Sequence, residues 1–260
     1  MASRQTWDLL AQRLYAKGMD MFVAASPPLT SSGARDPKVV ALTLLARTLK
    51  AMQATDMLIE AGLIVEARTV TRSIHENLFY AAALTKTGEA FVQELENDDI
   101  SIRRKRAKGL LEFFEKQDGG KTDRHAELEA YREHLWETHG KIAEISMAKA
   151  AQAGGVHDAF IAYRELSTDA AHPSAASLSR HVIAHDDPDG PPFTVVDEPA
   201  LDPLEDVDTL ELLCMAVLGV IVAVNETLGG VAAGERLDGL GEEFTRLSTS
   251  NKADRENVAS

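Results

Sequence analysis

The segment that decides the fold is Glu66-Ala67-Arg68-Thr69-Val70-Thr71-Arg72-Ser73-Ile74-His75-Glu76, inside an apolar stretch from Leu63 to about Lys86. At about 100° per residue, a helix over this segment places Arg68, Arg72 and His75 on one face. Burying charged side chains without partners costs several kcal/mol, so these residues are expected to be paired or to face a cleft. The segment therefore predicts a helix that carries polar groups where a bundle helix has core residues.

Helical patterns continue on both sides and predict an all-α helical bundle. The pair Asp36-Pro37 is typical of a helix start and Gly62 of a helix end, so the helices within 36–86 are expected to form an antiparallel hairpin, with one kinked rod as the alternative. A strongly apolar helix is expected from about Leu204 to Leu228. We expect an N-terminal helix and linker over 1–35, the bundle core over 36–232, and a short helix with a tail over 233–260.

The stretch 185–203 is rich in Asp, Pro and Gly and is expected to form a long surface loop. One β-like run, Phe193–Val196, has room to form a small hairpin there. Loops of this length are often lids or binding loops, with disorder as an equal alternative.

Composition limits the function classes. The 260 residues are 45% hydrophobic and carry a formal net charge of −14, which excludes coating of nucleic acid by bulk electrostatics but leaves room for a local basic cleft. The block Arg103-Arg104-Lys105-Arg106-Ala107-Lys108 is either a solvated helix face or a surface that contacts phosphate.

Several features favour a cytoplasmic protein without a membrane segment. Cys214 is the only cysteine and cannot form an intramolecular disulfide. The polar N-terminus lacks the apolar region of a signal peptide. The longest apolar run, Leu212–Val224, is shorter than the roughly 20 residues that cross a bilayer and is expected to be a buried helix.

A second polar segment runs from Tyr163 to Ser174 and contains Ser167 and His172. Pro173 ends the preceding helix and leaves His172 at its terminus. A histidine held there suits acid or base chemistry, since its ordinary pKa of about 6.5 shifts easily across neutrality. The structural alternative is a histidine that caps a neighbouring helix.

The pairing of Glu66-Ala67, Arg72 and Glu76 with Tyr163, Leu166-Ser167 and His172-Pro173-Ser174 resembles an uncharacterised bacterial helical domain of unknown function, over about 39–228. That domain is similar to the HEPN superfamily of helical bundles, which are often dimeric and include metal-independent ribonucleases of toxin and phage-defence systems. The nuclease members carry an arginine, four to six further residues and a histidine. Arg68 and His75 fit this spacing, although Thr69 stands where those nucleases usually have Asn, Asp or His.

The resemblance implies a homodimer that cleaves RNA without a metal or another cofactor. Such cleavage needs a base for the ribose 2′-hydroxyl and a cation for the phosphate. His75 or His172 would be the base, and Arg68 or Arg72 the phosphate ligand. The remaining polar residues of the two segments would complete the site as binding groups: Glu66, Glu76, Tyr163 and Ser167.

Three other interpretations stay open. The carboxylates can neutralise the arginines in a structural network in which Arg72 and Glu76 pair along the helix and meet Tyr163, Ser167 or His172. A non-catalytic sensor or adaptor bundle would use the same groups to bind a ligand or a protein partner. A metal-binding bundle would use Glu66, Glu76, His75 or His172, or else His181 and His185, which are spaced for one helix face beside Asp186 and Asp187.

Overall fold

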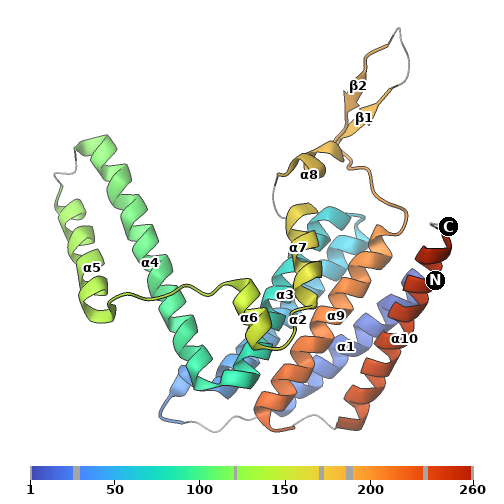
Figure 1. The fold of residues 1–260 in the computed structure, drawn as a ribbon, viewed down its shortest axis with the longest axis horizontal. Helices are drawn as coiled ribbons and strands as arrows, with labels where there is room; N and C mark the ends of the chain where they lie inside the picture. Colours follow the sequence, from blue (N-terminus) through green and yellow to red (C-terminus); the bar gives the residue numbers. More distant parts are fainter. Residues whose placement is uncertain are drawn as a thin grey trace.

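The computed structural model describes residues 2–25, 30–119, 122–169, 173–185, 190–230 and 234–258. Within these residues the fold is all-α, as the sequence predicts, with one short two-stranded sheet (Figure 1). The helices are α1 (Arg4–Ala24), α2 (Pro37–Glu60), α3 (Ile64–Thr87), α4 (Glu89–Asp118), α5 (Asp123–His139), α6 (Met147–Ala153), α7 (Ala159–Asp169), α8 (Ala175–Ser179), α9 (Glu205–Leu228) and α10 (Gly234–Val258), with a 3-10 turn η1 at Gly33–Arg35. The strands are β1 (Val182–Ala184) and β2 (Phe193–Val195).

The helices α2 and α3 form the expected antiparallel hairpin. Asp36 caps α2, because its carboxylate accepts a hydrogen bond from the Lys38 N–H at 2.8 Å. The chain reverses at Gly62, whose φ of 77° lies in the left-handed region that glycine adopts without strain. The alternative of one kinked rod is therefore wrong.

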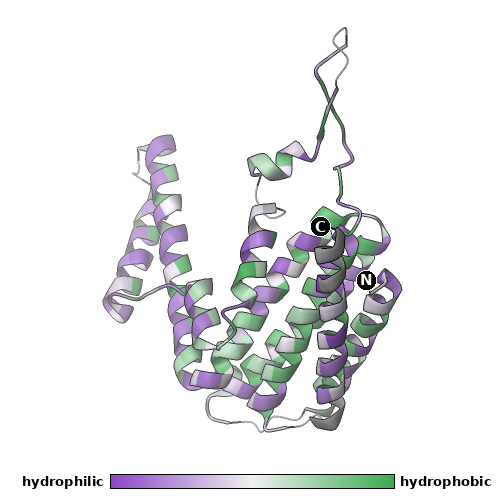
Figure 2. Cartoon of the chain, turned by 45° about the vertical axis from the view of Figure 1, so that its right-hand side comes forward, coloured by the Kyte–Doolittle hydropathy of each residue, from purple (hydrophilic) through white to green (hydrophobic). Residues whose placement is uncertain are grey.

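The core lies between α3 and α9, which also pack against α1, α2, α6, α7 and α10. Hydrophobic residues face inward in the bundle, whereas polar residues dominate α4 and α5 (Figure 2). By length and composition, α9 could cross a membrane, but 61% of its most apolar 18-residue window is buried inside the bundle. Its packing is that of the central core helix that the sequence predicts.

Both terminal helices contribute to this core. Trp7, Leu10 and Leu14 of α1 are fully buried, so the packed bundle begins before residue 36. At the other end, α10 covers 25 residues, whereas the sequence analysis expected only a short helix. Its buried side chains Leu237, Leu240 and Leu247 recur at helical spacing, and α10 packs on α9 and α1.

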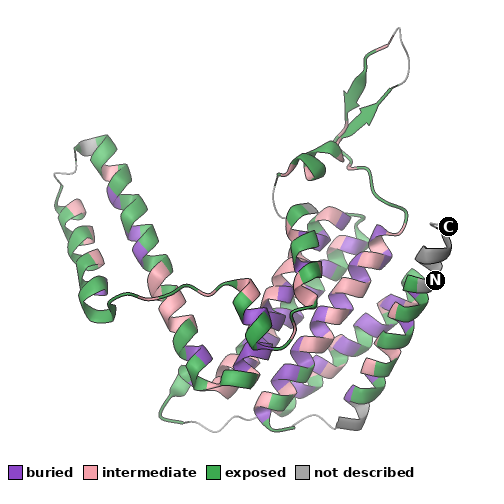
Figure 3. Cartoon of the chain, in the orientation of Figure 1, coloured by how far each residue is buried: buried purple, intermediate pink, exposed green. Residues whose placement is uncertain are grey.

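Two parts project from the bundle (Figure 1). We call α4 and α5 the arm, and α8 with β1 and β2 the hairpin unit. Both are mostly exposed (Figure 3). The run that begins at Phe193 does form a strand, and it pairs antiparallel with β1 so that Ile183 lies opposite Thr194. Strand β1 itself was not anticipated, because the sequence placed His181 and His185 on a helix.

Candidate functional site

The two polar segments meet where α7 lies against α3. Arg72 of α3 donates hydrogen bonds from Nε to Ser167 Oγ and from Nη2 to Tyr163 OH, both at 2.7 Å. Its Nη1 lies 3.1 Å from Glu76 Oε1, one turn further along the same helix. The predicted intrahelical pair and its contact with α7 are therefore confirmed.

The side chains of Arg72, Glu76, Tyr163 and Ser167 bond mainly to one another. The Tyr163 hydroxyl donates to Glu76 Oε1 at 3.2 Å, and Ser167 Oγ donates to the Tyr163 carbonyl at 2.8 Å. The Arg72 guanidinium also lies 4.8 Å from the centre of the Tyr163 ring, within cation–π range. Burial raises the pKa of Tyr163; the Arg72 charge opposes the rise and the Glu76 charge adds to it. The phenol is thus held as a proton donor.

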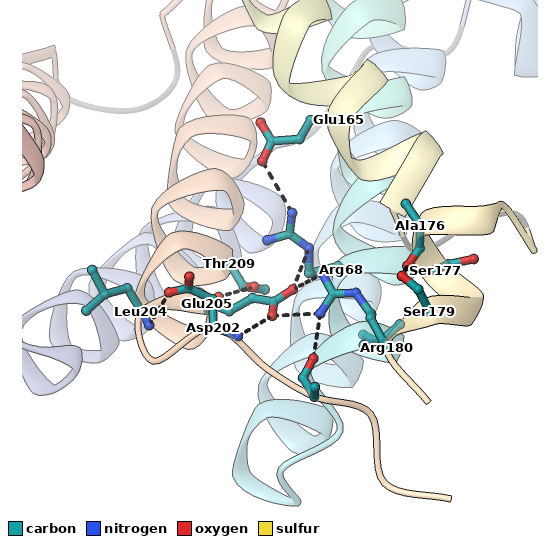
Figure 4. Close-up of polar contacts among 12 residues, drawn as sticks. Arg68, Glu165, Ala176, Ser177, Ser179, Arg180, Asp202, Leu204, Glu205 and Thr209 are labelled. Carbon is teal, nitrogen blue, oxygen red and sulfur yellow. Dashed lines mark hydrogen bonds and ion pairs between the residues drawn. The ribbon is translucent and has the colours of Figure 1, made fainter. Parts of the chain in front are cut away.

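Arg68 belongs to a different set of contacts, one turn before Arg72 (Figure 4). Arg68 is buried, with 4% of its surface exposed. Its Nη2 lies 3.4 Å from Glu165 Oε1 of α7, and its Nε lies 3.5 Å from Glu205 Oε1 of α9. Arg68 therefore joins three helices of the bundle through carboxylates.

Glu205 is the shared partner at the centre of this second set. It is 4% exposed and lies in the first turn of α9, where the helix dipole favours a negative charge. Arg180, which follows α8, donates to both of its carboxylate oxygens, at 2.7 and 2.8 Å. The Asp202 N–H donates to Oε2 at 3.2 Å. The two parallel hydrogen bonds between the Arg180 guanidinium and the Glu205 carboxylate attach the hairpin unit to the bundle.

A cavity of about 430 Å³ opens beside these ion pairs. It lies among α3, α7, α8 and α9, and its lining carries four carboxylates and two guanidiniums. The lining residues are Arg68, Glu165, Thr168, Ala176, Arg180, Asp202, Glu205 and Asp208.

His75 is buried in the bundle, although its spacing from Arg68 and Arg72 suggested an accessible polar face. The residue is fully buried, and its Nδ1 lies 3.1 Å from the Thr71 carbonyl oxygen. Because a carbonyl can only accept, the proton sits on Nδ1 and Nε2 is left as an acceptor, for which no partner is present among the described residues. Burial lowers the pKa of His75 to about 4. The imidazole is neutral at neutral pH and has no solvent-exposed surface.

The other sequence candidates are placed as follows. His172 lies outside the described residues. Glu66 is exposed in the first turn of α3 and does not line the cavity. The expectation that His181 and His185 share a helix face is wrong, because they flank β1 and bond across the hairpin to the Val196 carbonyl and the Thr194 hydroxyl. In the described part of the chain, no three His, Cys, Asp or Glu side chains are grouped closely enough to hold a metal ion.

Sequence reasoning missed Arg180 and Glu205, and it gave no role to Glu165, which lies within the second polar segment. Arg180 and Glu205 are 25 residues apart and carry no local motif. The signal that the sequence offers is the acidic first turn of α9, which contains Glu205, Asp206 and Asp208.

Comparison with known proteins gives one result. A family model described as "Family of unknown function (DUF5677)" matches residues 38–191, which is more than half of the chain. The chain belongs to this family. No curated protein and no solved structure matches it.

The Arg72 cluster predicts a specific loss of stability. Replacing Arg72 with Ala leaves the half-buried Glu76 carboxylate and the Tyr163 hydroxyl without their main partner, which should lower the free energy of unfolding by about 1–3 kcal/mol. The matched control is Arg103→Ala. It breaks an exposed ion pair in which Arg103 Nη2 lies 2.7 Å from Asp99 Oδ2, and it should lower the free energy of unfolding by about a few tenths of a kcal/mol. Urea denaturation measures both. Equal, small losses would mean that water screens the Arg72 cluster as well.

The sealed position of His75 predicts a pH dependence. Its pKa is about 4 in the folded chain and about 6.5 when unfolded, so between these values the unfolded state binds more protons. Stability from this residue is complete above pH 6.5 and is lost as the pH falls toward 4, by an amount on the order of 3 kcal/mol. We expect the free energy of unfolding to fall less between pH 7 and pH 4.5 for His75→Gln than for the wild type, as measured by urea denaturation at both pH values. The exposed His134→Gln is the control, and a wild-type difference retained in His75→Gln would contradict the assignment.

Proposed function

We propose that this chain is a non-catalytic sensor bundle that binds a small ligand carrying an ammonium or guanidinium group in the cavity beside Arg68 and Glu205. The observation that carries the proposal is the charge of the cavity. Four carboxylates line it against two guanidiniums, so its formal charge is −2. A cation is the ligand that such a lining attracts.

The contacts within the cavity support a guanidinium or ammonium ligand. Arg180 pairs with Glu205, and Arg68 lies between Glu205 and Glu165. The lining carries two further carboxylates, Asp202 just before α9 and Asp208 within it, so carboxylates outnumber guanidiniums by two. A volume of about 430 Å³ falls within the range of small-molecule sites. The net charge of −14 adds a long-range attraction for cations.

A ligand in this cavity would also act on the hairpin unit. Ala176 of α8 lines the cavity, and Arg180 holds the unit to the bundle through Glu205 and the Ala200 carbonyl. A cation placed beside Arg180 would weaken its attraction to Glu205, because like charges repel at short range in a partly buried site. Ligand binding would thus loosen the attachment of the hairpin unit to the bundle. A partner protein that binds the hairpin unit could distinguish the two states.

The proposal is tested by titrating the chain with agmatine and spermidine, with succinate as the anionic control. Calorimetry should show that the cations bind and succinate does not, and the affinity should fall as salt screens the cavity. Asp208→Asn should weaken binding by roughly 10-fold, which corresponds to about 1.4 kcal/mol. Glu112→Gln removes an exposed carboxylate of the arm and should leave the affinity unchanged. Absence of cation binding, or equal weakening by both variants, would refute the proposal.

A metal-independent ribonuclease is the competing function. It is favoured by one observation: Arg68 borders the open cavity and has the predicted spacing to His75 on the same helix. The buried imidazole weighs against it, since a general base must reach the proton that it removes.

Incubation of RNA with chelator and either the wild type or His75→Gln separates the two functions. We expect intact RNA in both reactions, because His75 is sealed from substrate. Cleavage by the wild type that a folded His75→Gln variant loses would replace the sensor proposal with the nuclease.

A further inference from the structure

The arm carries a second polar site that is separate from the cavity of the bundle. Its two helices pack against each other; the first turn of α4 packs on the bundle, and the rest of the arm projects from it (Figure 1). A cleft of about 680 Å³ lies between α4 and α5. Four cationic side chains line it, namely Arg104, Lys105, Lys108 and Arg132, against the two carboxylates Glu133 and Glu137. The cleft is therefore positive in a chain whose net charge is −14.

Arg104 is a buried cation at the floor of this cleft. The residue is 8% exposed, and its guanidinium donates to the Leu135 carbonyl at 2.5 Å and the Gly140 carbonyl at 2.8 Å. These carbonyls belong to the C-terminal end of α5, where a helix dipole favours a cation. Among the described residues no carboxylate pairs with Arg104, and its Nε has no hydrogen-bond partner. Its charge therefore remains available to attract an anion.

Trp136 supplies a flat apolar surface in the same cleft. The Arg104 guanidinium lies 4.2 Å from the centre of its ring and covers one face. Nevertheless, 52% of the residue is exposed. An indole fixed on one face and open to solvent on the other is a stacking platform for a nucleobase.

In the described part of the arm, the remaining cations are held by ion pairs at or near the surface. Lys105 pairs with Glu144, Lys108 with Glu112 at 3.8 Å, and Arg132 with Glu129 at 3.9 Å. Pairs of this kind contribute between nothing and about 1 kcal/mol, so a phosphate group can compete for these side chains.

We propose that this cleft binds single-stranded nucleic acid, with one base stacked on Trp136 and the flanking phosphates bound by Lys105, Lys108 and Arg132. The combination of a stacking face and a short row of cations matches the chemistry of single-strand binding, in which stacking is tolerant of sequence. The site is small, and the net negative charge of the chain repels a longer polyanion, so the contact is local. The proposal does not depend on the cation cavity of the bundle.

The chain's two tryptophans give a direct readout. Trp7 is fully buried in the bundle core, whereas Trp136 is exposed in the cleft. A base that stacks on Trp136 should quench only the exposed fraction of the emission. The oligonucleotide rU10 is a suitable probe, with uridine monophosphate and inorganic polyphosphate as comparisons that offer one nucleotide or phosphates alone.

At low salt, rU10 should bind and quench the fluorescence, and log affinity should fall with log salt at a slope of about −2 if three phosphates are contacted. Trp136→Ala should weaken binding roughly 10-fold or more, in line with the loss of one stacked base. Phe113→Ala removes another exposed aromatic residue of the arm that does not line the cleft, and it should have no effect.

Because Trp136→Ala also removes the partner of Arg104, the double variant Lys105→Gln/Lys108→Gln is tested beside it. Both of these lysines are exposed, so the fold should be kept while the salt slope becomes shallower by about 1.4. Absence of rU10 binding at low salt, or equal binding by all variants, would overturn the proposal. Uridine monophosphate or polyphosphate binding as tightly as rU10 would overturn the assignment to a single strand.

Discussion

The buried carboxylate of Glu205 is the constraint on which the arrangement of the site depends. An ionised carboxylate that is 4% exposed is stable only if cations and hydrogen-bond donors replace the water it has lost. Arg180 and Arg68 supply the cations, and they come from two separate segments of the chain. Neutralising Glu205 therefore ties the hairpin unit to α9 and brings the polar side of α3 to the same point. The cavity exists at the place where these three parts converge.

The helix α3 makes this convergence possible because its two sides have different partners. Its apolar side, with Ile74 and Leu78, is buried in the core, and α3 packs on both α2 and α9. Its polar side carries Arg72 and Glu76 toward α7, whose Tyr163 and Ser167 are also one turn apart. Periodic placement on both helices lets four polar groups bond to one another. This cluster links α3 to α7. The neighbouring Arg68 is the part of the polar side of α3 that lines the cavity.

The local part of this arrangement could be predicted from the sequence, and the long-range part could not. Residues one turn apart are neighbours on any helix, so the Arg72–Glu76 pair and the α2–α3 hairpin follow from spacing and from Gly62. Spacing shows which residues share a face but not how deep that face lies. His75 was accordingly assigned to an accessible site, although it is fully buried. The Arg180–Glu205 pair depends on how the hairpin unit folds back to α9, which no residue pattern records.

The two proposed sites also explain how a basic block can be retained in so acidic a chain. In the bundle, surplus carboxylates line the cavity, and the surrounding charge of the chain strengthens their attraction for a cation. The same charge would weaken any anion site placed on the bundle. On the arm, the anion site depends on its own lining, where Arg104, Lys105, Lys108 and Arg132 outnumber Glu133 and Glu137. Because screening limits more distant charges to roughly 10 Å at ordinary salt, this local excess decides which ion the cleft attracts. The two sites therefore differ in the sign of the charge that lines them.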